Sequence, residues 1–248
     1  MASLTPAPAW IELLDLTRLE AAVGDEDAVT DLCRRARTRY GNVAAVCVYP
    51  GYVGLARDLL TDSGIAIATV ANFPGGDQRL EQVLAEVGRA LRDGATEIDV
   101  VVPYRRWLQG DTHSVPALLD RVAEICAGRA QIKAILETGL IPSSAECQAL
   151  AWACARPGVA FLKTSTGKAG RGATPEAVGD LVRVLASLRD AGRPMGLKIA
   201  GGVRTRDQLQ RYYEIIVQTL GSGFFQPATL RIGASSLLEE LLAAAPHG

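Results

Sequence analysis

Eight short apolar runs alternate with eight amphipathic segments along the chain, and this alternation constrains the fold more than any other feature. Runs of this kind are typical of buried β-strands, and the segments between them carry apolar residues at helical spacing. Strands that alternate with helices form a parallel sheet, because each crossover helix returns the chain to the same end. The strand-like runs cover residues 11–17, 43–49, 66–73, 97–102, 132–138, 160–165, 196–200 and 230–234, and the helical segments cover 25–40, 54–62, 77–93, 115–127, 143–155, 175–191, 206–220 and 237–244.

The repeat count of eight in a chain of 248 residues predicts an α/β fold of one type, a (β/α)8 TIM barrel that forms a single domain over residues 1–248. An open doubly wound sheet is the alternative. Neither a G-x-G-x-x-G sequence nor a Walker sequence follows the first strands, which disfavours it. Helix boundaries are marked by Ser143 with Glu146, by Thr174 with Pro175, and by Gly94 and Gly192.

Composition excludes several classes of protein. Lys and Arg total 26 and Asp and Glu total 27, so the chain is not a strongly basic nucleic-acid-binding domain. The longest uncharged stretch, residues 40–56, is short and contains Pro50 and three glycines, so we expect no membrane span. The first residues lack the basic start of a secretory signal, and the five cysteines include no C-x-x-C pair. We therefore expect a cytoplasmic protein with reduced thiols and no metal site.

Lysine is rare in this chain, since 22 of the 26 basic residues are Arg. Three of the four lysines, Lys133, Lys163 and Lys198, lie inside apolar strand-like runs, where a surface lysine is unusual. A buried lysine can lose its proton and act as an amine nucleophile, whereas Arg stays charged. The alternative interpretation is that the genome composition favours Arg and that these four lysines remain by chance.

Strand side chains alternate between two faces, and the apolar face must meet the helices. The other face then delivers six charged side chains to the barrel interior: Glu97, Asp99, Lys133, Glu137, Lys163 and Lys198. Buried charges must neutralise one another, because an unpaired charge costs several kcal/mol. The set is either a structural salt-bridge network or a functional site, and we favour the site because such groups often gather there.

Lys163 and Lys198 are both predicted near the carboxyl ends of their strands, where barrels of this type carry their chemistry. Two neighbouring amines repel as cations, which lowers the pKa of one and frees its lone pair. Such an amine forms a Schiff base with a carbonyl, and Asp99 could then shuttle protons with Lys198 and a water. Loops rich in glycine and serine follow the last three predicted strands, at 164–168, 201–202 and 233–236, and can hold a phosphate through backbone N–H groups.

Eight sequence motifs resemble those of the deoxyribose-phosphate aldolase family. They are LLDLTRL (13–19), AAVCVYP (44–50), ATVANFPGG (68–76), GATEIDVVVPYR (94–105), KAILETG (133–139), FLKTSTGKAGRGATPE (161–176), LKIAGGVRT (197–205) and LRIGASSLL (230–238). The resemblance implies a Schiff-base lysine at Lys163 and a proton-relay pair of Asp99 and Lys198. It implies a phosphate site formed by Gly167, Lys168, Gly201, Gly202, Ser235 and Ser236, and we expect Asp15, Thr17, Cys47, Lys133 and Thr166 to line the pocket.

The implied reaction is the reversible cleavage of 2-deoxy-D-ribose 5-phosphate to acetaldehyde and D-glyceraldehyde 3-phosphate, as in deoxyribose and deoxynucleoside catabolism. It needs no metal and no cofactor, because the protonated imine withdraws the electrons. The partners implied are a sugar phosphate, small aldehydes and a second copy of the chain in a homodimer, with no nucleic acid and no membrane.

Two departures from the family and two alternative functions remain. Many relatives end in a tyrosine that assists proton transfer, whereas this sequence ends Ala-Pro-His-Gly, and Gly76 replaces a frequent histidine. His113 and His247 lie outside every motif and are expected at the surface. The alternatives are a Schiff-base aldolase for a different phosphorylated acceptor, and a barrel that binds a sugar phosphate without chemistry.

Overall fold

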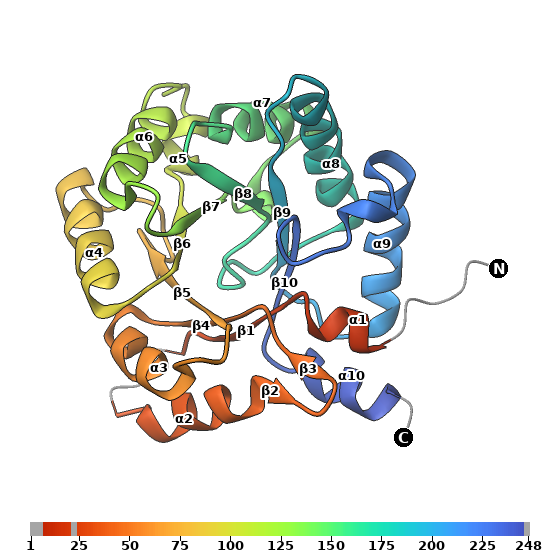
Figure 1. Ribbon diagram of the computed structural model, residues 1–248. Helices are drawn as coiled ribbons and strands as arrows, with labels where there is room; N and C mark the ends of the chain where they lie inside the picture. Colours follow the sequence, from red (N-terminus) through yellow and green to blue (C-terminus); the bar gives the residue numbers. More distant parts are fainter. Residues whose placement is uncertain (1–6, 21–23, 246–248) are drawn as a thin grey trace.

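The computed structural model describes residues 7–20 and 24–245, and within them eight parallel strands close into a barrel (Figure 1). The strands pair in the order β1, β4, β5, β6, β7, β8, β9, β10, and β10 pairs again with β1. They are β1 (Leu14–Arg18), β4 (Ala45–Val48), β5 (Ala66–Ala71), β6 (Glu97–Val101), β7 (Gln131–Ile135), β8 (Val159–Lys163), β9 (Gly196–Ala200) and β10 (Leu230–Ala234). The predicted (β/α)8 barrel is confirmed.

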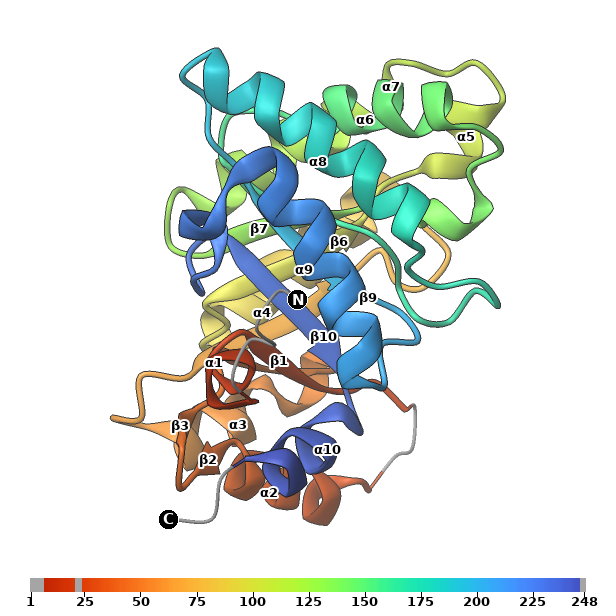
Figure 2. The same ribbon diagram turned by 90° about the vertical axis from the view of Figure 1, so that its right-hand side faces the viewer.

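Helices surround the barrel and connect consecutive strands. They are α1 (Ala7–Ile11), α2 (Glu26–Arg35), α3 (Val53–Leu60), α4 (Leu80–Asp93), α5 (Tyr104–Leu108), α6 (Ser114–Cys126), α7 (Ser144–Cys154), α8 (Pro175–Asp190), α9 (Arg206–Leu220) and α10 (Leu237–Ala244), with short 3-10 turns at Pro50–Tyr52, Thr138–Leu140 and Ser222–Phe224. Helices α8 and α9 lie side by side outside the strands (Figure 2). Within the described residues, no helix is long and apolar enough to span a membrane.

Sequence patterns explain where these helices begin, end and pack. In α4, Val83, Val87 and Ala90 recur at helical spacing and are buried. Gly94 ends α4 in the left-handed conformation, and the Thr174 hydroxyl accepts the Ala177 N–H at the start of α8, as both motifs predict.

Several predicted boundaries differ from the observed ones, and two of them change which element a segment belongs to. Ile11 belongs to α1 rather than to the first strand, which begins at Leu14. The helix predicted over 25–40 ends at Arg35 and is followed by the two-stranded hairpin of β2 (Arg37–Thr38) and β3 (Gly41–Asn42). Arg37 and Thr38 are extended and pair with Asn42 and Gly41, so this hairpin replaces the last turn of the predicted helix.

Alternation along the strands separates an apolar outer layer from a charged interior. In β6, Ile98 and Val100 belong to the hydrophobic core, whereas Glu97 and Asp99, which alternate with them, are buried charged residues. Ile132 pairs with Val159 while the next residue, Lys133, pairs with Phe161, so β8 contains one extra residue at Ala160. This bulge keeps Phe161 and Lys163 on the same face as Lys133.

Candidate active site

The carboxylate of Asp99 connects three lysines from three other strands. Its Oδ2 accepts hydrogen bonds from Lys163 Nζ and from Lys198 Nζ, each at 2.7 Å, and its Oδ1 accepts one from Lys133 Nζ at 3.1 Å. Asp99, Lys133 and Lys198 are fully buried, and Lys163 is 3% exposed. Strand register explains the meeting, because Asp99 is paired with Lys133, and Lys163 with Lys198, on adjacent strands.

A second group of ion pairs lies on the other side of Lys198. Asp15 Oδ2 is 2.5 Å from Lys198 Nζ, and Asp15 Oδ1 accepts from Arg231 Nη1 at 2.8 Å. Glu97 Oε1 accepts from Arg231 Nη2 at 2.8 Å, and Glu97 Oε2 pairs with Lys133. The interior is therefore one continuous network of ion pairs that crosses the barrel.

Two neighbouring lysines in this network have opposite pKa shifts. Burial lowers the pKa of Lys163, Lys198 lowers it further, and the opposing effect of Asp99 does not compensate. Burial also acts against the charge of Lys198, but Asp15 and Asp99 outweigh it and raise its pKa. Burial acts to raise the pKa of Asp99, yet the three lysines hold it well below its usual range. Lys198 is thus an ammonium, Asp99 a carboxylate, and Lys163 the amine that loses its proton most easily.

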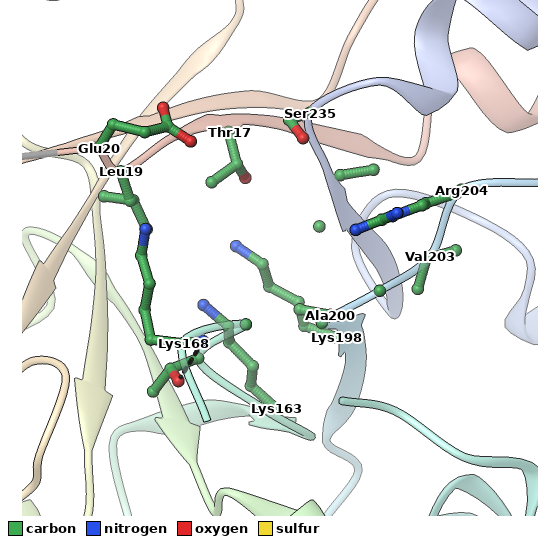
Figure 3. Close-up of a pocket in the computed structure, with 16 residues that line it drawn as sticks. Thr17, Leu19, Glu20, Lys163, Lys168, Lys198, Ala200, Val203, Arg204 and Ser235 are labelled. Carbon is green, nitrogen blue, oxygen red and sulfur yellow. Dashed lines mark hydrogen bonds between the residues drawn. The ribbon is translucent and has the colours of Figure 1, made fainter. Parts of the chain in front are cut away.

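Lys163 ends β8 and points into a cavity at the carboxyl ends of the strands (Figure 3). Lys198 extends into the middle of the same cavity, while Lys168 and Arg204 flank it on opposite sides. The lining residues are Thr17, Leu19, Glu20, Lys163, Thr166, Gly167, Lys168, Lys198, Ala200, Gly201, Gly202, Val203, Arg204, Gly233, Ala234 and Ser235. A reactant in this cavity has direct access to the amine of Lys163.

Glycines shape one wall of the cavity. Gly201 and Gly202 follow β9 with positive φ angles of 92° and 76°, and Gly167 follows β8 with 76°. The Gly201 carbonyl accepts the Ala173 N–H at 3.0 Å, and a Cβ on Gly172 would lie 2.1 Å from that carbonyl oxygen. Only glycine residues allow two backbone segments to approach this closely. The two loops therefore form a tight backbone surface suited to an anion.

Glu137 holds the loop that follows β8. It lies beyond the end of β7 in the left-handed conformation, with φ of 54°. Its Oε2 accepts the Thr166 N–H at 3.2 Å and the Thr166 hydroxyl at 2.5 Å, and the Thr166 hydroxyl in turn accepts the Lys168 N–H at 3.0 Å. The sequence prediction placed Glu137 inside the strand with the other charges; its backbone turns instead, and its carboxylate supports the loop.

Comparisons with known proteins show the family to which this chain belongs. Residues 11–241 match the family described as DeoC/LacD family aldolase. The chain belongs to this family of aldolases. A curated deoxyribose-phosphate aldolase from Agrobacterium fabrum is 39% identical over 237 residues, which are 95% of this chain and 90% of the relative.

Solved structures show the same fold for this aldolase. A Coccidioides immitis protein provisionally named a deoxyribose-phosphate aldolase superposes with a TM-score of 0.83 at 27% identity, covering 97% of this chain and 87% of that one. A deoxyribose phosphate aldolase from Aeropyrum pernix, described as having a unique tetrameric structure, gives a TM-score of 0.74 at 27% identity, covering 95% of this chain and 91% of that one.

The structure divides the predicted site residues of the aldolase into two groups. Those that line the cavity are Lys163, Lys198, Thr17, Thr166, Gly167, Lys168, Gly201, Gly202 and Ser235. Asp15, Cys47, Asp99 and Lys133 are fully buried and are not among the lining residues. Ser236 is exposed at the start of α10 and also does not line the cavity.

Sequence reasoning missed Arg231 in the interior and Arg204 at the rim. Arg231 lies between Leu230 and Ile232, so the alternation rule applied to this strand identifies it as an inward charge. Arg204 follows β9 in an irregular loop, where no periodicity indicates the direction of a side chain.

Metal-binding groups and the two histidines are further candidate parts of a site. Across residues 7–20 and 24–245, no group of three or more His, Cys, Asp or Glu side chains is placed to hold a metal ion. His113 is exposed just before α6, and His247 lies outside the described residues.

Proposed function

We propose that this aldolase cleaves 2-deoxy-D-ribose 5-phosphate reversibly to acetaldehyde and D-glyceraldehyde 3-phosphate, through a Schiff base on Lys163. The observation that carries the proposal is the environment of one amine. Lys163 Nζ opens onto the cavity, its pKa is lowered first by burial, and it lies 2.7 Å from the Asp99 carboxylate. A neutral amine beside a proton acceptor is what nucleophilic attack on an aldehyde requires.

The bond changes follow from this arrangement. The lone pair of Lys163 attacks the C1 carbonyl of the open-chain sugar, and loss of water from the carbinolamine gives a protonated imine. Removal of the C3 hydroxyl proton breaks the C2–C3 bond, releases glyceraldehyde 3-phosphate, and leaves the bonding electrons in an enamine on Lys163. Protonation of that enamine and hydrolysis of the imine release acetaldehyde and restore the amine.

Asp99 and Lys198 are the groups placed to move these protons. The low pKa of Asp99 keeps it ionised, so it carries no proton to donate, whereas Lys198, which hydrogen-bonds to its Oδ2, carries one. A proton delivered to the site therefore comes from Lys198 through the shared oxygen or through a water, and Asp99 accepts the returning proton.

The phosphate is proposed to bind at the other end of the cavity. Backbone N–H groups of Gly167, Gly201 and Gly202, the Ser235 and Ser236 segment and the ammonium of Lys168 supply the donors and charge. Arg204 adds a second cation on the opposite side from Lys168, which favours a phosphorylated over a neutral substrate (Figure 3).

Reduction with borohydride tests the nucleophile. Protein incubated with acetaldehyde and then reduced should carry an ethyl group on Lys163, located by peptide mass mapping. The same treatment of Lys163→Arg should give no ethyl group on the corresponding peptide, because a guanidinium forms no stable imine. An adduct on Lys198, or none in the parent, would reject Lys163 as the nucleophile.

Cleavage rates separate the proposed substrate from its alternative. Deoxyribose 5-phosphate should be cleaved at least about a hundredfold faster, in kcat/KM, than fructose phosphates of the same charge. Faster cleavage of a fructose phosphate would assign the site to a different acceptor.

The setting of the reaction is part of the same proposal. The five cysteines are free and buried, which suits the reducing cytoplasm. We infer a homodimer and a role in deoxyribose catabolism; light scattering tests the first, and growth of a deletion strain on deoxyribose tests the second. A mass four times that of the chain would instead match the assembly described for the Aeropyrum pernix relative.

A further inference from the structure

Charges in the barrel interior do not balance. Among the described residues, this interior network contains four cationic side chains and three carboxylates. The cations are Lys133, Lys163, Lys198 and Arg231, and the carboxylates are Asp15, Glu97 and Asp99. Because a buried charge without a partner is costly, one cation must give up its proton most readily. Which one does so depends on how the carboxylates are shared.

Arg231 occupies two of the three carboxylates. Its guanidinium contacts Asp15 Oδ1 at 2.8 Å and Glu97 Oε1 and Oε2 at 2.8 and 3.2 Å, while its Nε donates to the Pro227 carbonyl at 2.6 Å. The side chain is buried in the network and lies 5.6 Å from the Phe161 ring centroid. A guanidinium does not release its proton in proteins, so Arg231 is a fixed positive charge.

Lys163 is left with the smallest share of negative charge. Its ammonium would have one carboxylate within 4 Å, Asp99, and Asp99 already serves Lys133 and Lys198. Lys133 also has Glu97, and Lys198 also has Asp15. The titratable and charged groups that act on Lys163 are Asp99 on β6, Lys198 on β9, Cys47 on β4 and Glu137 after β7.

Glu137 does not restore the balance. No ion pair joins it to a lysine within residues 7–20 and 24–245, and its oxygens are occupied by Thr166. Burial moreover raises the pKa of Glu137, which favours its neutral form.

We propose that Arg231 is a positioning residue that sets the charge balance of the barrel interior, so that Lys163 is the cation left without a carboxylate of its own. The inference rests on the proposed role of Lys163 and deepens it. Arg231 does not line the cavity. It acts on Lys133 and Lys198 through their shared partners Glu97 and Asp15.

Removing this fixed charge should make Lys163 a stable ammonium. Arg231→Gln keeps hydrogen-bond donors for Asp15 and Glu97 but leaves three cations for three carboxylates. The pH at which the rate of imine formation on Lys163 is half its maximum, here called the midpoint, should then move up by about one unit. Loss of a nearby cation favours the charged amine. At a pH below the midpoint, imine formation slows about tenfold.

Glu97 offers the opposite change. Glu97→Gln is nearly isosteric and leaves four cations for two carboxylates, so the midpoint should move down by a similar amount. The double variant Arg231→Gln with Glu97→Gln again has one cation in excess, and its midpoint should return to within about 0.3 pH units of the parent. Arg231→Lys introduces a cation that can release its proton and that makes fewer hydrogen bonds to Asp15 and Glu97, so its midpoint should lie between those of the parent and of Arg231→Gln.

The decisive measurement is the rate at which acetaldehyde forms a borohydride-trapped imine on Lys163, followed from pH 5 to pH 10 after rapid mixing. Opposite shifts in the two single variants and their cancellation in the double variant support the proposal. Equal slowing at every pH in Arg231→Gln, without cancellation, overturns it in favour of a packing role.

Two controls keep the result interpretable. If Arg231→Gln does not fold, as judged by thermal unfolding, Glu97→Gln and Arg231→Lys decide the matter, and a midpoint unmoved in Glu97→Gln rejects the proposal. If the parent forms no imine on Lys163, the proposed function fails; if the parent forms it and no variant shifts the midpoint, only the role of Arg231 fails.

Discussion

Lys163 and Lys168 are five residues apart, yet they belong to regions of the molecule with opposite construction. The interior around Lys163 consists of buried side chains in ion pairs less than 4 Å long. The rim around Lys168 is exposed and is built from backbone, with glycines at positive φ. In the interior, neighbouring charges determine which groups hold protons; at the rim, the shape of the backbone determines which anion the proposed phosphate site accepts. Substitutions in the two regions should therefore change different kinetic constants.

The same substitution at both lysines gives the largest contrast. Lys163→Arg keeps the charge but removes the proposed nucleophile, so kcat/KM on deoxyribose 5-phosphate should fall by about ten-thousandfold or more. Lys168→Arg keeps the only property that we assign to that side chain and should cost less than about tenfold. Equal losses in the two variants would contradict the division between chemistry and recognition.

Asp99→Asn should have the next largest effect. The amide keeps the shape but cannot accept a proton between Lys163 and Lys198, so kcat should fall by about a thousandfold, as for loss of a general base. Binding of the sugar phosphate should change little, because Asp99 lies beneath the cavity and away from the rim. Equilibrium dialysis with the substrate checks this, and loss of binding together with loss of turnover would mean that Asp99 holds the cavity open.

Lys168→Met tests the rim by itself. Loss of the proposed phosphate contact should raise KM for deoxyribose 5-phosphate by about ten- to thirtyfold and leave kcat nearly unchanged. Unphosphorylated deoxyribose is the matched control, and its kcat/KM should stay within about twofold of the parent. A parallel loss on both substrates would place Lys168 in the chemical step.

Substitution of one glycine in each region should have the smallest effects on activity and allows the stability of the two regions to be compared. A Cβ on Gly196 would lie 2.3 Å from the Phe161 ring, so Gly196→Ala should lower the free energy of unfolding by about 1–3 kcal/mol. Gly202 has open space around it but a positive φ, so Gly202→Ala should cost about 1 kcal/mol. Thermal unfolding measures both, and only Gly202→Ala should raise KM.

Much of this arrangement could be predicted from alternation along single strands. The rule assigns Asp99, Lys133, Lys163 and Lys198 to the interior, and the structure brings all four together. It also indicates Arg231 when it is applied to the last strand. The fold follows from the same local pattern, because period and strand count need no knowledge of distant contacts.

Pairings between distant strands could not be predicted in this way. Asp15 meets Lys198 and Arg231 because β1 closes against β10, and this contact determines which lysine keeps its proton. Glu137 has a left-handed backbone conformation, which its residue type does not predict. Both depend on closure of the barrel and on loop geometry, which no window of sequence contains.

The Phe161 ring fills the space that a side chain at residue 196 would need, and Lys133 and Arg231 flank it. The ring thus packs between β8 and β9 on the inner side of the barrel, and the cavity lies at the carboxyl ends of the strands, beside Lys168 and Arg204. Under the proposed chemistry, the three-carbon product has to depart before water can reach the two-carbon fragment still bonded to Lys163. Steady-state inhibition by the two products should accordingly show an ordered sequence, with acetaldehyde leaving last.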